Sequence, residues 1–416
     1  MLTETATTAG TPDLAPPPGM LVDEADRDLA AGRIDARVAA ERYRDAAMAL
    51  EGRDSRYRLE LLDRAVALDP AAFWGWLLRA RVALEVADLE RAGQSVDRLD
   101  ALAATAGRRQ RLMADTTAGA LAMVRGLVAE AAARFTRACE LGRELVASRP
   151  AQPVYRHDLV LALGEAAAAF ALLDREEEAL AATTEAADLT AALVAAYPDD
   201  ERWPGELART VAARGDIELG MGRVETARAS YRQALGLLRR IVEANPRDPA
   251  RRHELTACLE RFGSALSGAG ATAAALEVFR EGLDLTEALV AADPENRVWA
   301  WDRTLLRTKL GSQLDAIGDV QEALRQLDQA LAEAEALATA HPDHARHGML
   351  VVNVLVARGE VLANGDGSDA FASFMRAART LKALDDRGLA PPDHDERQRW
   401  LMGRMMQLAI PADVPQ

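Results

Sequence analysis

The 416-residue chain has few aromatic residues, two cysteines and almost no lysine. Aromatic side chains make up 4% of the sequence and hydrophobic residues make up 49%, so alanine and leucine carry the apolar content. These two residues lose little on entering a helix, and the mixture therefore favours helices over strands. Lys309 and Lys382 are the only lysines, and we attribute the dominance of arginine to codon bias rather than to chemistry.

An excess of positive charge is also missing. The formal net charge is −15, so the chain lacks the basic surface that phosphate binding needs, and we expect no nucleic-acid partner. An acidic surface favours solubility and permits a basic partner. The two cysteines, Cys139 and Cys258, each fall within a helical pattern, which predicts buried free thiols in a reducing compartment.

No stretch approaches 18 uninterrupted apolar residues, so we expect no membrane span. Residues 1–20 have neither a basic start nor an apolar core, which is unlike a signal peptide, and their composition is typical of a disordered tail. These features predict a cytoplasmic protein.

What the sequence does contain is a repeat of 48 residues. The spacing recurs in five columns: Pro150, Pro198, Pro246, Pro294 and Pro342; Gly119, Ala167, Gly215, Gly263, Gly311 and Gly359; Ala131, Ala179, Ala227, Ala275 and Ala323; Phe135, Thr183, Tyr231, Phe279 and Leu327; Ala138, Ala186, Ala234, Gly282 and Ala330. In the last repeat Ala370, Phe374 and Ala377 take these roles one residue early, so the turn near Asn364–Asp369 is shorter by one residue.

The columns predict two helices in each repeat. Gly or Ala lies in the middle of the first helix and Ala twice in the second, where the backbones must approach closely, and a larger side chain fills the gap between them. Glycines such as Gly222 and Gly270 mark the turn between the helices, and proline follows the second helix because it cannot continue one. Asp248–Pro249 is an N-cap followed by proline at the first helical position.

The spacing small-x11-Ala-x3-aromatic-x2-Ala resembles the core of the tetratricopeptide repeat (TPR). Residues 39–106 resemble two 34-residue copies, the first with Ala46, Ala65 and Pro70, the second with Trp76, Ala80 and Ala92. The second copy departs from the family pattern, with Arg79 where Leu is usual and Ala83 where Tyr is usual. In the 48-residue copies each helix is longer by seven residues, about two turns, so that helices of about 20 residues keep their buried face in register.

The resemblance implies an all-α fold, a TPR-like αα solenoid in which antiparallel helix pairs form a right-handed superhelix. We expect a disordered tail over residues 1–20, a capping helix over 21–38, two 34-residue repeats over 39–106, six extended repeats over 107–390, and a second capping helix and tail over 391–416. Trp400, Leu401, Met405 and Leu408 are the expected lid at the C-terminal end.

Repeats of this kind imply a binding groove lined by the first helix of each pair. The candidate groove residues are polar where their neighbours are apolar: Arg209, Asp216, Glu260, Ser264, Thr308, Ser312, Asn353 and Glu360. The alternative is a solvated inner face without a ligand. Some TPR proteins grip a terminal carboxylate with Lys, Asn and Arg, but Tyr43, Ala47, Trp74 and Leu78 stand at the matching places, which argues against that mode.

Two further columns have a functional and a structural interpretation. The acidic column Asp158, Glu206, Glu254 and Asp302 could bind a basic peptide, although we favour carboxylates that complement helix dipoles. The aromatic column comprises Tyr155, Trp203 and Trp299, with His157, His253 and Trp301 two residues later. These side chains could anchor an interface with a partner. We favour the structural interpretation, in which they pack the added helical turns against the previous repeat.

A metal site is conceivable at His341, His344 and His347, near Asp343, but Pro342 interrupts this run, and steps of three residues do not place three rings on one helical face. No Walker, dinucleotide, nucleophile-elbow or metalloprotease motif is present, and the repeats leave no room for a catalytic domain. We therefore expect no enzyme activity and no cofactor.

The function most consistent with these features is a scaffold or adaptor that docks another protein or peptide through its groove or edge. The extended repeats resemble those fused to kinases, NTPases or proteases in bacterial signalling and defence, which suggests an effector or sensor acting in trans. The alternatives are a peptide-responsive regulator and a self-assembling structural protein. The oligomeric state stays open.

Overall fold

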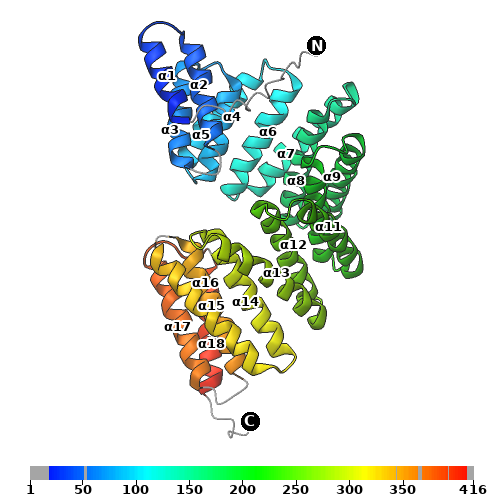
Figure 1. Cartoon of the computed structure of the whole chain (residues 1–416), viewed down its shortest axis with the longest axis vertical. Coiled ribbons are helices and arrows are strands. Elements are labelled where there is room, and N and C mark those ends of the chain that lie inside the picture. The colour runs from blue at the N-terminus through cyan, green and yellow to red at the C-terminus, as the bar shows by residue number, and fades with distance from the viewer. Residues whose placement is uncertain (1–17, 51–53, 343, 364–367, 392, 410–416) are drawn as a thin grey trace, which may run out of the picture. The chain divides into compact units, whose positions relative to one another are not determined.

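The computed structural model describes residues 18–50, 54–342, 344–363, 368–391 and 393–409. Within them the chain is entirely helical apart from its turns, and it divides into two compact units, residues 1–189 and 190–416. Successive helices pack as antiparallel pairs in each unit, which confirms the all-α, TPR-like architecture (Figure 1). The expected tail over 1–20 and the turn at 364–367 lie largely outside the described residues.

The first unit begins with the shortest helices of the chain and continues into longer ones. Its helices are α1 (Pro18–Ala30), α2 (Ala36–Ala49), α3 (Ser55–Leu68), α4 (Phe73–Glu85), α5 (Leu89–Ala103), α6 (Arg108–Val124), α7 (Val128–Ser148), α8 (Pro153–Leu172) and α9 (Glu176–Ala196), whose last turns belong to the second unit. The helix lengths rise from 13–15 residues in α1–α5 to 20 and 21 residues in α8 and α9.

The second unit continues the long helix pairs to the C-terminal end. Its helices are α10 (Arg202–Gly220), α11 (Val224–Ala244), α12 (Pro249–Gly268), α13 (Thr272–Ala292), α14 (Arg297–Ala316), α15 (Val320–Ala340), α16 (Ala345–Leu362), α17 (Ser368–Asp385) and α18 (His394–Ala409). Asp248 caps α12 by accepting from the backbone N–H of Ala250 at 2.9 Å, with Pro249 as the first helical residue, as the sequence predicts.

The N-terminal capping helix is shorter than expected. The sequence predicts one helix over 21–38, but α1 ends at Ala30 and α2 begins at Ala36. Gly32 has a φ of +65°, a conformation that ends a helix, and the Asp35 side chain accepts from the N–H of Val38 at 2.9 Å and starts the next one. The boundary was misplaced because a single glycine in a polar stretch is a weak signal.

The glycine column lets the two helices of a repeat approach closely. A methyl group at Gly359 of α16 would lie 2.7 Å from Phe374 of α17, and one at Gly311 would lie 2.7 Å from Leu327. The large partners are completely buried, with exposed fractions of 0% for Phe374 and Leu327. The large side chain therefore fills the space that glycine leaves, which is the packing that the columns predict.

The turns inside the repeats use a left-handed residue. Gly126, Gly222, Gly270 and Gly318 have φ values between +71° and +83° at the C-terminal ends of α6, α10, α12 and α14. In two repeats the same position holds Ala87 (φ 59°) and Asp174 (φ 57°). The hydrogen bonds are alike, since Asp88 N–H donates to Ala83 at 2.8 Å just as Leu127 N–H donates to Ala122. The L residues therefore hold a strained conformation that glycine adopts freely.

The first helices of successive pairs contact one another, whereas the second helices do not. In the second unit α10 contacts α12, α12 contacts α14, and α14 contacts α16, and in the first unit α4, α6 and α8 do the same. Among the described residues, α11, α13, α15 and α17 make no comparable contact with one another. The first helices therefore form the inner layer of each unit, the side that is concave in a solenoid.

The helix α9 is long and apolar enough to cross a membrane by length and composition. Its apolar face contains Ala179, Thr183 and Ala186, which are all buried and follow the three- and four-residue spacing of a packed helix. The helix also begins with three glutamates, Glu176–Glu178. These are the features of a core helix of the repeat.

The helix that covers the C-terminal end, α18, buries only part of its expected apolar set. Leu401 and Met405 of α18 are buried as expected, but Trp400 is 45% exposed and contacts Phe374 edge to face with 6.0 Å between ring centroids. The free thiols follow the sequence prediction, because Cys139 and Cys258 are buried and burial raises the pKa of each to about 12.

The glycine column makes a testable prediction. Gly359→Ala should lower the free energy of unfolding by about 1–3 kcal/mol, because the added methyl overlaps Phe374 in a full core. Gly236→Ala in α11 is the matched control, since a methyl there meets nothing within 4 Å and alanine raises helix propensity. Urea unfolding followed by circular dichroism measures both, and equal effects of the two substitutions would contradict the packing described.

The left-handed turns make a second prediction. Ala87→Gly should stabilise the chain by about 1 kcal/mol, because the exposed Ala87 loses backbone strain and no packing. Gly222→Ala should cost a similar amount at the equivalent turn. Thermal unfolding of the two variants measures both effects, and a loss of stability in Ala87→Gly would show that strain at this turn is absent.

Candidate functional site

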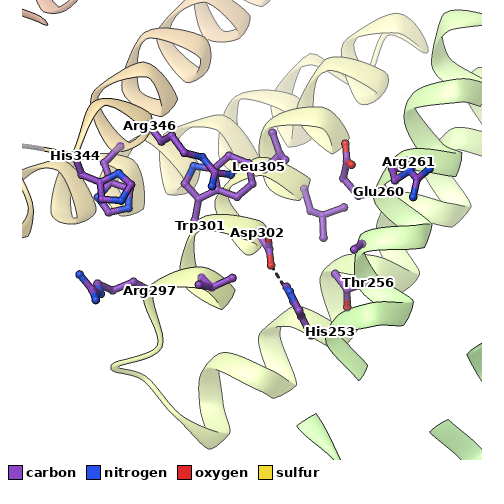
Figure 2. A pocket seen from close by; sticks show the side chains of 14 residues that line it. His253, Thr256, Glu260, Arg261, Arg297, Trp301, Asp302, Leu305, His344 and Arg346 are labelled. Atoms are coloured by element: carbon purple, nitrogen blue, oxygen red, sulfur yellow. Dashed lines mark ion pairs between the residues drawn. The ribbon is translucent and has the colours of Figure 1, made fainter. Parts of the chain in front are cut away.

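A pocket of about 470 Å³ opens on the inner layer of the second unit (Figure 2). Its walls come from the first helices of three successive pairs, α12, α14 and α16. The lining residues are His253, Thr256, Ala257, Glu260, Arg261, Arg297, Val298, Trp301, Asp302, Leu305, Leu306, His344, Arg346 and His347. A volume of this size suits a small molecule or a few residues of a peptide.

The middle of the pocket is apolar and belongs to α14. Trp301 and Leu305 lie one turn apart on the same face of this helix, and Leu306 beneath them is fully buried. Figure 2 shows Trp301 and Leu305 between the side chains of α16 and those of α12. A ligand in the pocket would therefore lie against an aromatic ring and a branched aliphatic side chain.

Asp302 of α14 and His253 of α12 form an ion pair at the α12 side of the pocket. Asp302 Oδ2 lies 3.1 Å from His253 Nδ1, although the two atoms are not aligned for a hydrogen bond. The neighbouring carboxylate raises the pKa of His253 above its ordinary value of 6.5, against the opposing effect of burial. This pair joins two repeats across the pocket.

Glu260 and Arg261, also on α12, each form an ion pair with an oppositely charged side chain of a neighbouring helix. Glu260 pairs with Lys309 of α14 and accepts from Ser264 Oγ at 2.9 Å. Arg261 pairs with Asp216 of α10. The carboxylates of these two pairs, Glu260 and Asp216, were candidate groove residues. In the structure they link one repeat to the next.

The α16 side of the pocket is basic. The guanidinium of Arg346 lies over the ring of Trp301 at 4.5 Å, and Arg297 extends from the start of α14. The ring of His344 stacks on that of His347 with 4.4 Å between centroids. His347 is only 6% exposed, and its Nδ1 has no hydrogen-bond partner in the described structure. Burial lowers the pKa of His347, so the ring is neutral near pH 7.

The three histidines of the sequence run lie close together without sharing one helical face. The rings of His341 and His347 lie 5.7 Å apart, because His341 and His344 flank the turn before α16 and only His347 lies in the helix. No group of three His, Cys, Asp or Glu in the described part of the chain is arranged to hold a metal. Asp343 lies outside the described residues.

The remaining candidate groove residues are bonded within the inner layer or exposed. Glu360 accepts from Arg404 of α18 at 2.8 Å, so Asp216–Arg261, Glu260–Lys309 and Glu360–Arg404 form an inter-repeat ladder. The hydroxyls of Thr308 and Ser312 donate to backbone carbonyls one turn earlier in α14, and Arg209 pairs with Glu206. Asn353 is exposed and lines a separate hollow beside Trp400.

Each carboxylate of the acidic column has a cationic partner. Asp158, which is 4% exposed, accepts from Arg109 Nε at 2.6 Å. Glu206 and Glu254 pair with Arg209 and Arg251 of their own helices, and Asp302 pairs with His253. Only Asp302 of this column lines the pocket.

The structure thus brings two predicted site residues, Glu260 and Asp302, into one pocket with residues that were not predicted as a site. The aromatic column had already placed His253 and Trp301 on equivalent positions of neighbouring repeats, which is the signal that could have indicated their proximity. The sequence did not indicate Arg297 and Arg346, because arginine is frequent throughout the chain. Only the fold shows which arginines have a carboxylate partner.

No family model matches the sequence, and no curated protein matches it. Solved structures resemble its fold at low identity. A tetratricopeptide repeat protein from Parabacteroides merdae is 16% identical, with 79% of this chain and 98% of that chain covered and a TM-score of 0.42. A Rap protein complexed with competence and sporulation factor is 13% identical over 94% and 97% of the two chains, with a TM-score of 0.45.

A third similar structure is aspartyl phosphate phosphatase F from Bacillus subtilis, which is 10% identical over 99% of this chain and 97% of that chain, with a TM-score of 0.47. The TPR-like architecture of the chain itself is shown by its sequentially paired helices and its repeat columns. Likeness at this level concerns the helical architecture, so the function has to be argued from the residues of this pocket.

We expect the pKa values of the partly buried His253 and the buried His347 to be shifted in opposite directions. His253 should titrate above pH 6.5 and His347 below it, as measured by NMR of the imidazole resonances. Because the pKa of His253 is raised on folding, its pairing stabilises the native chain below pH 6.5, and this contribution is lost as pH rises through the raised pKa. The pKa of His347 is lowered on folding, so burial of its neutral ring contributes to stability above pH 6.5. This contribution to stability is lost as pH falls through the lowered pKa.

Asp302→Asn is the control for this titration. It should bring the pKa of His253 down, since burial then acts without the carboxylate, and leave that of His347 unchanged. A His253 pKa that does not respond to this substitution would contradict the ion pair.

Proposed function

We propose that the chain is a non-catalytic interaction module that docks a short peptide segment of another protein in the pocket of α12, α14 and α16. One observation supports this most directly: a single pocket is lined by the first helices of three successive pairs and contains buried polar atoms without protein partners. Such atoms cost free energy when left unsatisfied, so a ligand that bonds to them binds favourably.

A peptide also fits the form and charge of the site. The pocket extends across three helices. It combines an apolar floor on α14 with polar groups on its α12 and α16 sides. Binding sites of this kind fix a ligand through a few polar contacts and gain affinity from apolar burial. The net charge of −15 argues against nucleic acid as the partner.

The cellular role that we propose is that of a cytoplasmic adaptor, whose partner is an effector or sensor of bacterial signalling or defence. The support is the repeat architecture, which fills almost the whole described chain, and the resemblance of its long repeats to those joined to effector domains. The adaptor would hold such a partner in trans.

A peptide-responsive regulator is the second candidate, and a specific feature favours it. His253 lies on α12 and Arg346 on α16, so a ligand that contacts both bridges helices from three repeats at once. Among the described residues, the α14–α16 junction has no rung of the inter-repeat ladder, because Ala357 stands where Lys309 stands one repeat earlier and Arg261 two repeats earlier. A bridging ligand would strengthen this junction and reduce the radius of gyration, which small-angle scattering measures.

The proposal can be tested with a displayed library of random peptides and the full chain. Ala257→Trp places a large side chain in the pocket at an exposed position of α12 and should abolish selection of the peptides that the native chain retains. Ala273→Trp on α13 is the matched control, since Ala273 is exposed and does not line the pocket, and this variant should retain them.

Two outcomes would contradict the proposal. Peptides that bind both variants equally would place the binding surface elsewhere on the chain. A library that yields no peptide for the native chain, at low salt and with repeated rounds, would remove the peptide-binding function itself.

A further inference from the structure

The charges that line the pocket are unequally satisfied. Glu260, Arg261 and Asp302 each have an oppositely charged partner within 4 Å. Arg297 and Arg346 have no carboxylate partner among the described residues, although the chain carries more acidic than basic side chains. Both arginines line the α16 side of the pocket, so an excess of positive charge faces the cavity there.

Two buried nitrogen atoms belong to residues that line this pocket. Nδ1 of His347 and Nε1 of Trp301 are buried, and neither has a hydrogen-bond partner in the described structure. The side chain of His347 is more than nine-tenths buried, and both residues line the pocket. The indole N–H can only donate, so its missing partner is an acceptor.

The start of α16 adds to the positive potential. This helix begins at Ala345, and its first turn contains no acidic residue and no side-chain cap. By contrast α14, which begins beside it, is capped by Asn296 through the N–H groups of Val298 and Trp299. The uncapped amides of α16 therefore carry the unsatisfied partial charge of a helix N-terminus.

We propose that this basic side of the pocket, formed by Arg297, Trp301, Arg346 and His347, binds an oxyanion, carried by a ligand whose apolar part lies against Trp301 and Leu305. The inference rests on the proposed peptide-binding function and specifies its chemistry: the peptide presents a carboxylate here. Phosphate offers the same acceptor oxygens, and the experiment separates the two.

The geometry suits an oxygen anion better than a neutral acceptor. Arginine presents a planar set of donors that matches a carboxylate or phosphate, and charge-assisted hydrogen bonds are about twice as strong as neutral ones. The stacking of Arg346 on Trp301 restrains its guanidinium beside the indole, so less freedom is lost when the anion binds.

The test uses the full chain and three small probes: N-acetyl-leucine, N-acetyl-leucinamide and inorganic phosphate. The first two differ only in the carboxylate. The indole N–H resonance of Trp301, assigned by Trp301→Phe, reports occupancy in NMR titrations. N-acetyl-leucine should shift this resonance and raise the pKa of His347, because an anion beside the ring favours its protonated form, whereas N-acetyl-leucinamide should do neither.

Charge-removing variants locate the anion. Arg297→Gln and Arg346→Gln should each raise the dissociation constant for N-acetyl-leucine about tenfold or more, the loss expected for one charge-assisted contact. Arg247→Gln is the matched control, because Arg247 is exposed in the turn before α12 and does not line the pocket. The same loss in all three variants would indicate a general effect of charge and overturn the assignment.

The other outcomes are equally decisive. Equal binding of the acid and the amide would overturn the oxyanion site while leaving peptide docking intact, since the library selection with Ala257→Trp tests that separately. Binding of phosphate alone would retain the oxyanion site and overturn the carboxylate as its source. Failure of both anions to shift Trp301 at millimolar concentration would overturn the inference.

Discussion

The structure depends on one steric constraint, the contact between a small residue in the first helix of a repeat and a large one in the second. At Gly119, Gly311 and Gly359 a methyl group would overlap the facing ring or leucine. Close approach of the helices buries the large side chain completely, and each pair then offers a flat face to the next. The contact thereby sets the spacing of the two helices in each pair, on which the packing of the inner layer depends.

The inner layer is held by polar as well as apolar contacts. The ladder of Asp216–Arg261, Glu260–Lys309 and Glu360–Arg404 uses residues that a functional interpretation of the sequence had assigned to a ligand. Half-exposed pairs of this kind contribute only about 0–1 kcal/mol each, so they orient neighbouring repeats more than they stabilise them. Polarity in a groove therefore indicates binding only where the polar group lacks a partner within the protein.

That criterion separates the two sides of the pocket. The α12 side is rich in charge, but its charges are paired with one another or with the next repeat. The α16 side holds two arginines that no described carboxylate contacts. It also holds the buried Nδ1 of His347 and Nε1 of Trp301, which have no hydrogen-bond partner in the described structure. A ligand gains most where it satisfies groups that folding has already removed from water.

The sequence by itself determined the fold class, the helix pairing, the small-to-large contacts and the buried thiols, because each depends on spacing along one chain. It misplaced the end of the first capping helix, where one glycine decided the boundary. It could not show how close the rings of His341, His344 and His347 lie, since these residues flank a turn. Only the tertiary structure decided which charges remain available. Nothing in the sequence distinguishes Arg261 from Arg346 as a paired or an available charge. In the structure, Asp216 of a neighbouring helix pairs with Arg261, whereas no described carboxylate contacts Arg346.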